Sequence, residues 1–177
     1  MYKSILLTLF LVFLLVGCAV YEGSDLSIEL NPGIDTVEVN TEFIDAGATA
    51  TLGRTTHRVT ILENTVDVTT VGTYHIIYQT VYHDTVKTLT RKVDVVDQTP
   101  PVIELNPGVD TIIRGEIWED AGVTVTDNSE LDVTVTVSGN VINTIAGEYV
   151  ITYTATDAFG NTSEITRYVH VVPPYEA

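Results

Sequence analysis

A long internal repeat constrains this sequence more strongly than any other feature. The stretch "ELNPGIDTVEVNTEFIDAG" at residues 29–47 recurs as "ELNPGVDTIIRGEIWEDAG" at residues 104–122, an offset of 75 residues. The same offset relates "GTYHIIYQT", which begins at Gly72, to "GEYVITYTA", which begins at Gly147. A period of this length is too long for one coil of a solenoid, so the sequence predicts two homologous domains in tandem.

Differences between the two copies help to locate the domain boundaries. The offset has become 76 by Arg91 and Arg167, so we expect one extra residue in the second copy, within "DAFGNTS". We place the first domain at residues 25–97 and the second at residues 98–173, followed by a short C-terminal tail at residues 174–177. The connecting "DQTPP" contains two prolines, which stiffen the backbone and restrict the relative orientation of the domains.

Each copy alternates apolar and polar residues with a period of two. In "DVTVTVS", Val133, Val135 and Val137 share one face, which predicts a half-buried strand. "NPG" at residues 31–33 and 106–108 predicts a type II turn, with glycine where a positive φ is needed. Short strands between frequent turns, with no helical stretch after the N-terminal segment, indicate an all-β fold of two tandem antiparallel β-sandwiches.

The N-terminal segment has a different character. Lys3 precedes an apolar run at residues 5–16 in which Thr8 is the only polar residue. Such a run spans only about 18 Å as a helix, less than the ~30 Å hydrocarbon core of a bilayer. We therefore expect a secretory signal peptide at residues 1–17. The junction "LVGC" resembles the lipobox of bacterial lipoproteins, and the resemblance implies a diacylglyceryl thioether on Cys18.

The predicted lipid would hold the chain at a membrane through a tether at residues 18–24. Two acyl chains anchor a protein stably, because each buried methylene contributes ~0.8 kcal/mol. The rest of the chain would then be extracytoplasmic. Since Cys18 is the only cysteine, no thiol would remain for a disulfide or for nucleophilic catalysis. The net charge of −16 argues against nucleic acid as a partner.

The order of motifs in the second copy resembles a known domain family. "TPPVIELNPG", "DAGVTVTDN", "AGEYVITYTATDAFGNTS" and "TRYVHVV" resemble the bacterial immunoglobulin-like domain of a pesticidal crystal protein and many surface proteins, a relative of hyalin-type repeats. The resemblance covers nearly all of residues 98–172 and implies an Ig-like fold and a role as a binding or spacer module. The first copy departs from it, with "ATLGRTTHR" in place of "VTDNSELD" and "TVYHDTVKT" in place of "ATDAFGNTS".

Four aromatic residues occupy equivalent positions in pairs. Tyr74 and Tyr149 each stand two residues after a glycine, which resembles the tyrosine corner of Ig-like sandwiches and favours a structural role over stacking on a sugar. Phe43 and Trp118, the only tryptophan, both lie just before "DAG". Because the position is shared, we expect an aromatic of the core or rim there in preference to a carbohydrate platform.

Acidic loops of the second copy raise a calcium hypothesis, since calcium prefers carboxylate and carbonyl oxygens. In an Ig-like sandwich two of these loops would lie at the same end of the domain, and one alternative is that this end faces the interdomain junction, where the linker lies. The two loops and the linker carry five candidate ligands: Asp97, Asp127, Asn128, Asp157 and Asn161. The first copy has Leu52 and Tyr82 in place of Asp127 and Asp157, so at most one site is expected. The alternative is that these residues serve only the turns.

A charged residue is repeated inside the predicted core. Arg91 and Arg167 have the strand phase of inward-facing residues. A buried guanidinium needs a partner, and we expect Asp45 and Asp120 of the repeated "DAG" to provide it.

The sequence contains no recognisable pattern of catalytic residues. Its four histidines have no metal-ligand spacing, and it has no G-x-S-x-G motif and no phosphate-binding glycine loop. We therefore expect a non-catalytic, lipid-anchored surface protein without a cofactor, acting as a spacer or interaction module. The alternative is an adhesin or glycan-binding protein that uses loops of the second domain, with calcium as a candidate requirement and an envelope protein or a glycan as its partner.

Overall fold

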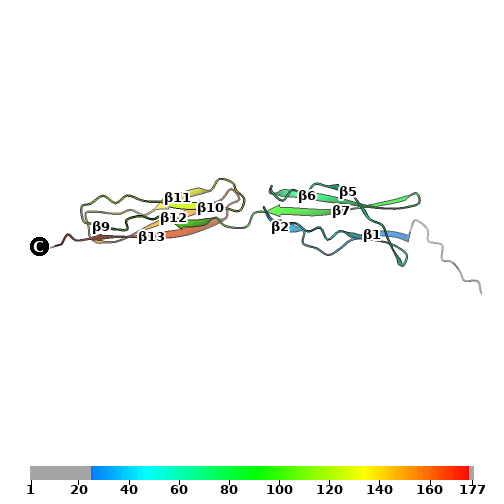
Figure 1. The fold of residues 1–177 in the computed structure, drawn as a ribbon, viewed down its shortest axis with the longest axis horizontal. Helices are drawn as coiled ribbons and strands as arrows, with labels where there is room; N and C mark the ends of the chain where they lie inside the picture. The colour runs from blue at the N-terminus through cyan, green and yellow to red at the C-terminus, as the bar shows by residue number, and fades with distance from the viewer. Residues whose placement is uncertain (1–24, 176–177) are drawn as a thin grey trace, which may run out of the picture.

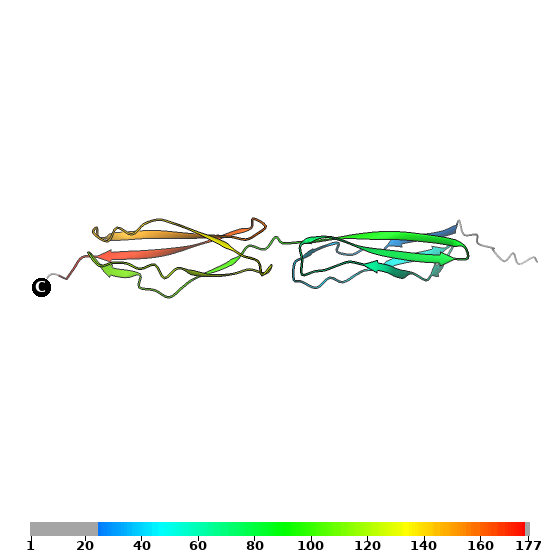
Figure 2. The same cartoon turned by 90° about the horizontal axis from the view of Figure 1, so that it is seen from above.

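Two all-β bodies lie end to end in the structure (Figure 1, Figure 2). The computed structural model describes residues 25–175. The predicted signal peptide, the Cys18 lipid site, the tether at residues 18–24 and the last two residues, 176–177, lie outside the described residues. Within residues 25–175, no helix is long and apolar enough to cross a membrane.

The first domain is a sandwich of two sheets. Its smaller sheet has three strands, in the order β1 (Leu26–Leu30), β3 (Ala48–Leu52) and β4 (Thr55–His57). Its larger sheet has four strands, in the order β2 (Thr36–Glu38), β7 (Thr85–Val96), β6 (Gly72–Tyr82) and β5 (Thr60–Asn64).

The second domain repeats this plan with one strand fewer. Its smaller sheet pairs β10 (Val123–Thr126) with β8 (Val102–Leu105). Its larger sheet has the order β11 (Thr134–Ser138), β12 (Gly147–Thr156), β13 (Thr162–Val172) and β9 (Thr111–Ile113). No strand of β1–β7 pairs with a strand of β8–β13 in the described part of the chain. The prediction of an all-β, Ig-like fold in two tandem sandwiches is confirmed.

The larger sheet of each domain is not wholly antiparallel, in contrast to the prediction. β2 runs parallel to β7, and β9 runs parallel to β13. The chain passes from the smaller sheet to the larger sheet at the "NPG" bend without reversing its direction (Figure 1). The strand that follows the bend therefore meets the last strand of the domain in the parallel sense.

Alternating residues of the two long strands build each core. In the first domain, Ile76 and Tyr78 of β6 and Val93 and Val95 of β7 are almost fully buried. Their counterparts in the second domain, Ile151, Tyr153, Val169 and Val171, are buried in the same way. The period of two in the sequence thus corresponds to one face of each long hairpin turned inward.

The prediction of a type II turn at "NPG" is wrong. Neither Gly33 nor Gly108 has the positive φ that such a turn requires. Glycine is needed there for space, because a Cβ on Gly33 would lie 2.7 Å from the Cβ of Ala46 and 3.3 Å from Nη1 of Arg91. The equivalent Cβ on Gly108 would lie 2.8 Å from the Cβ of Ala121.

The strand predicted at "DVTVTVS" is confirmed as β11, but the prediction that it is half-buried is wrong. Every residue of β11 is exposed, and Val137 keeps 56% of its accessible surface. β11 is an edge strand of its sheet, and the equivalent edge strand of the first domain, β5, is almost as exposed. An alternating pattern alone does not reveal whether an edge strand is covered.

The extra residue of the second copy is found where it was predicted. Val81 pairs with Val86 in the first domain, and Thr156 pairs with Thr162 in the second. Four residues connect the first pair and five connect the second. The additional residue therefore belongs to the β12–β13 loop, which faces the first domain (Figure 1).

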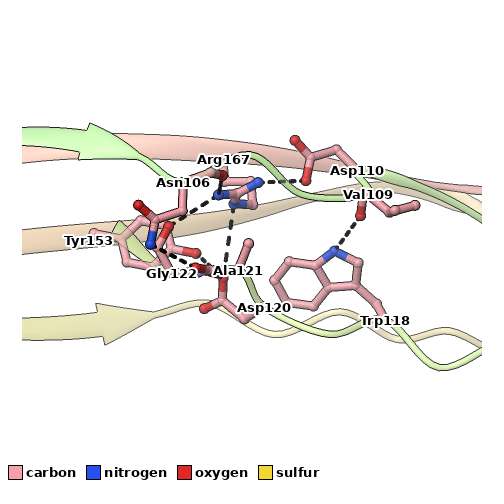
Figure 3. Close-up of polar contacts among 9 residues, drawn as sticks. All are labelled: Asn106, Val109, Asp110, Trp118, Asp120, Ala121, Gly122, Tyr153 and Arg167. Atoms are coloured by element: carbon pink, nitrogen blue, oxygen red, sulfur yellow. Dashed lines mark hydrogen bonds and ion pairs between the residues drawn. The ribbon is translucent and has the colours of Figure 1, made fainter. Parts of the chain in front are cut away.

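A buried guanidinium connects the strands and loops of each domain, as Figure 3 shows for Arg167. The Arg167 side chain is 2% exposed, and its Nη1 donates to Asp110 at 2.8 Å. Nη2 donates to the carbonyl oxygens of Asn106 at 2.7 Å and Gly122 at 3.2 Å. Nε lies 3.9 Å from Oδ1 of Asp120, the predicted partner. Sequence reasoning missed the closer carboxylate, Asp110.

The first domain contains the same cluster around Arg91. Its Nη1 donates to Asp35, and its Nε lies 3.4 Å from Oδ1 of Asp45. Asp45 also accepts a hydrogen bond from the hydroxyl of Tyr78 at 2.5 Å. Burial and this carboxylate raise the pKa of Tyr78 above its usual value, so the phenol stays a donor. Each cluster thus attaches the "NPG" bend and the "DAG" loop to the long hairpin.

The two carboxylates around Arg167 are expected to differ in importance. Asp110→Asn should lower the free energy of unfolding by about 3 kcal/mol, because it leaves a buried guanidinium without its nearest charge. Asp120→Asn keeps an oxygen that can accept from Tyr153 and should cost only about 1 kcal/mol. Urea unfolding followed by the fluorescence of Trp118, the only tryptophan, reports the second domain selectively. Equal costs for the two variants would contradict this assignment.

Candidate functional site at the interdomain junction

Three carboxylates meet where the domains join. Asp97 directly follows β7, Asp127 follows β10, and Asp157 follows β12. One carboxylate oxygen from each lies within 4.8 Å of the other two. These three strands end at the same level of the molecule (Figure 1), so residues far apart in the chain converge. All three were candidate ligands in the sequence, and the structure brings them together.

Local turns hold two of these carboxylates in place. Oδ1 of Asp127 accepts the N–H of Ser129 at 2.9 Å. Oδ1 of Asp157 accepts the N–H groups of Phe159 at 2.9 Å and Asn161 at 2.8 Å, while its Oδ2 accepts from Nδ2 of Asn161 at 2.7 Å. Burial alone would raise the pKa of Asp157, but these hydrogen bonds lower it below its usual value. Asp157 is therefore held as a carboxylate.

Several oxygens at the junction are buried without a donor. Asp97 is only 7% exposed, and its Oδ2 has no hydrogen-bond partner. Oδ2 of Asp127 and the side-chain oxygen of Asn128 are likewise buried and unpartnered. A buried acceptor without a donor costs about 1–3 kcal/mol, and more when it is charged. Three such atoms in one place need an explanation.

Glu38 contributes a fourth carboxylate from the first domain, and sequence reasoning missed it. Its Oε1 accepts the linker N–H groups of Gln98 at 2.8 Å and Thr99 at 3.0 Å. It also accepts from Nδ2 of Asn128 in the second domain at 3.3 Å. The only signal in the sequence is a difference between the copies, since Ile113 stands at the equivalent position of the second domain.

The junction is strongly negative. Burial raises the pKa of Asp97 above its usual value, and the adjacent carboxyl of Glu38 raises it further. The charges of Asp127 and Asp157 act in the same direction. Burial would also raise the pKa of Glu38, but hydrogen bonds from the linker lower it overall. Among the described residues, none of these four carboxylates forms an ion pair with a Lys, Arg or His.

Two asparagines connect the domains directly. Nδ2 of Asn161, a predicted ligand, donates to the carbonyl oxygen of Asp97 at 3.2 Å. Nδ2 of Asn40 in the first domain donates to the carbonyl oxygen of Asn128 at 2.8 Å. Together with Glu38, these contacts attach the linker to loops on both sides of the junction.

The predicted structural tyrosines occupy equivalent positions near the start of β6 and of β12. The hydroxyl of Tyr74 donates to the carbonyl oxygen of Thr70 at 2.7 Å, and that of Tyr149 donates to the carbonyl oxygen of Ile145 at 2.8 Å. In both domains the hydroxyl thus reaches a carbonyl four residues upstream, which is the contact expected of a tyrosine corner.

The aromatic pair before "DAG" lies at the surface of each domain. Phe43 and Trp118 are both half-buried, and neither belongs to the core. Trp118 donates from Nε1 to the carbonyl oxygen of Val109 at 3.0 Å (Figure 3). It lines two adjacent hollows of about 380 and 460 Å³, whereas Phe43 lines one of about 330 Å³.

Two tandem Ig-like sandwiches, whose repeated polar residues support the fold, define a modular protein. Residues 32–95 and 103–171 each match the family described as "Bacterial surface protein, Ig-like domain". The chain therefore belongs to this family, and each of its two domains is one copy of the family's domain.

Three solved structures illustrate the matches to this chain. The lipoprotein BT2262 from Bacteroides thetaiotaomicron is 18% identical, with a TM-score of 0.36 over 80% of this chain and 98% of that chain. Human mucin-like protocadherin EC1-2 is 12% identical, with a TM-score of 0.36 over 83% and 98%. The fibronectin(III)-like modules of Clostridium thermocellum CbhA are 15% identical, with a TM-score of 0.35 over 86% and 97%. No curated protein matches the sequence.

Glu38 is expected to order the linker. Glu38→Ala removes the acceptor of two linker N–H groups, and hydrogen bonds to a charged group contribute about 1.5–3 kcal/mol. Amide hydrogen exchange at Gln98 and Thr99 should accelerate by at least about tenfold. The control is Glu42→Ala, which removes an exposed carboxylate of the same region. Unchanged exchange in the Glu38 variant would show that the linker is ordered by other contacts.

Proposed function

We propose that this protein is a non-catalytic, lipid-anchored spacer that holds its second domain away from a bacterial membrane. The observation that carries the proposal is the end-to-end arrangement of the domains, with the described chain entering at one end and leaving at the other (Figure 1). The contacts of Glu38, Asn40 and Asn161 support it, because they connect the two domains across a short linker. The "LVGC" lipobox would supply the anchor through Cys18.

Lipidation is tested by Cys18→Ala in a bacterial host supplied with an alkyne analogue of palmitate. The wild-type protein should take up the label and sediment with membranes, because a diacyl group gives stable anchoring. The variant should lose the label and appear in the soluble fraction. Ser24→Ala, which alters the predicted tether and keeps the cysteine, should behave as the wild type. An unlabelled wild type, or a labelled variant, would contradict the anchor.

A second candidate function is glycan binding at the hollows beside Trp118. Asp120 lines both hollows, and Ile117, which is 82% exposed, adds an apolar surface beside the ring. An aromatic ring with an adjacent carboxylate offers both a stacking face and a hydrogen-bond acceptor to a sugar. The equivalent hollow beside Phe43 provides an internal comparison within the same chain.

Glycan binding is tested on an array with the wild type, Trp118→Ala and Phe43→Ala. If Trp118 binds a sugar, the wild-type signal should fall by about tenfold in the Trp118 variant and persist in the Phe43 variant. Absence of any signal for the wild type would reject this function and leave the spacer. Equal losses in both variants would point to a change in folding instead of a binding site.

A further inference from the structure

We propose that one Ca²⁺ ion binds at the interdomain junction, held by Asp97, Asp127 and Asp157 with the side-chain oxygen of Asn128. The inference deepens the proposed spacer function, and its consequence for stiffness rests on that function. Glu38 is a positioning residue, because its contacts place the linker that carries Asp97.

The positions of the oxygens fit a single calcium ion. Calcium binds oxygen ligands at about 2.3–2.6 Å, so two ligands on opposite sides of the ion are about 4.6–5.2 Å apart. The carboxylate oxygens of Asp97, Asp127 and Asp157 all lie within 4.8 Å of one another. All the groups that converge are oxygens, whereas zinc prefers nitrogen and sulfur donors, so the ligand set disfavours zinc. Magnesium is a poorer fit because it keeps most of its waters and rarely takes a cage of protein ligands.

A second observation is independent of the number of acidic groups. Asp97 is more than nine-tenths buried, yet its Oδ2 has no donor. The neutral side-chain oxygen of Asn128 is buried and unpartnered as well. Since native proteins pair almost all buried acceptors, a missing positive partner at this point explains both atoms at once. A bound cation would take the place of the missing donors.

The charge at the junction also favours a bound cation. The four carboxylates at the junction have no Lys, Arg or His partner among the described residues. Like charges this close together destabilise the folded junction unless something offsets them. A divalent cation would reduce the repulsion between Asp97, Asp127 and Asp157 and the effect of the nearby Glu38.

Comparison of the two repeats predicts a single calcium site, because the ligand residues are not repeated. Leu52 and Tyr82 occupy the positions of Asp127 and Asp157 in the first domain, and Leu52 is part of the core. At the far end of the second domain, Ile113 and Pro173 stand where the first domain has Glu38 and Asp97. Within residues 25–175, such carboxylates are therefore brought together only where the two domains meet.

Binding would stiffen the spacer, because the ligands belong to different parts of the chain. Asp97 directly follows the last strand of the first domain, whereas Asp127 and Asp157 belong to loops of the second. An ion between them would fix the second domain relative to the linker. We expect a dissociation constant of about 0.1–1 mM, the range of extracellular calcium modules.

The site is tested by calorimetric titration of CaCl₂ into purified full-length protein that was first freed of metal with EDTA. We expect one ion per chain and a higher thermal midpoint by Trp118 fluorescence, with MgCl₂ giving at least tenfold weaker binding. Asp97→Asn and Asp127→Asn should weaken calcium binding by at least tenfold. In EDTA the same variants should unfold at a higher urea concentration than the wild type, since they remove repulsion. Asp132→Asn, an exposed carboxylate nearby, should change neither property.

A variant that binds calcium more weakly but resists urea better than the wild type in EDTA cannot be misfolded. Absence of heat and of a midpoint shift in the wild type would overturn the site, and so would undiminished binding in Asp97→Asn. Equal binding of Mg²⁺ would overturn the assignment to calcium. Small-angle X-ray scattering should show a narrower distribution of interdomain distances with calcium, and an unchanged distribution would overturn the stiffening. Lipid labelling at Cys18 does not depend on the metal, so a failure of the anchor is distinguished from a failure of this site.

Discussion

Each domain depends on a guanidinium that is almost wholly withdrawn from water. Arg91 and Arg167 are 1% and 2% exposed, and each reaches two backbone carbonyls and two carboxylates. These acceptors lie in the bend after the first strand and in the loop before the third. A buried charge is tolerated only if its partners are held in position, so the cluster determines how the bend and the loop pack on the long hairpin.

The same requirement explains why the repeat is best preserved around this cluster. "NPG" supplies a carbonyl acceptor and a glycine without a side chain, and "DAG" supplies a carboxylate and a second carbonyl. A larger residue at Gly108 would collide with Ala121 and approach the guanidinium. The ends of the domains carry no such constraint, and there the two copies have diverged.

The divergence of the domain ends determines which residues meet at the junction. At one end of the first domain, Leu52 completes an apolar core, whereas Asp127 at the equivalent position of the second domain faces the linker. Glu38 and Asp97, which come from the first domain and its end, join Asp127 at the junction. The proposed calcium site would require both domains and would therefore control their relative orientation in the proposed spacer.

The sequence by itself determined the two-domain organisation, the all-β class and the inward face of the long hairpins, because repeats and alternation are local patterns. It also identified Asp97, Asp127 and Asp157, since each follows a strand that the pattern predicts. Tertiary structure alone decided that Asp35 and Asp110 are the nearest partners of the arginines, that β11 is uncovered, and that Glu38 joins the junction. These contacts connect residues from 56 to 90 positions apart, and such distances are set by how sheets and domains pack and not by the spacing of residues along the chain.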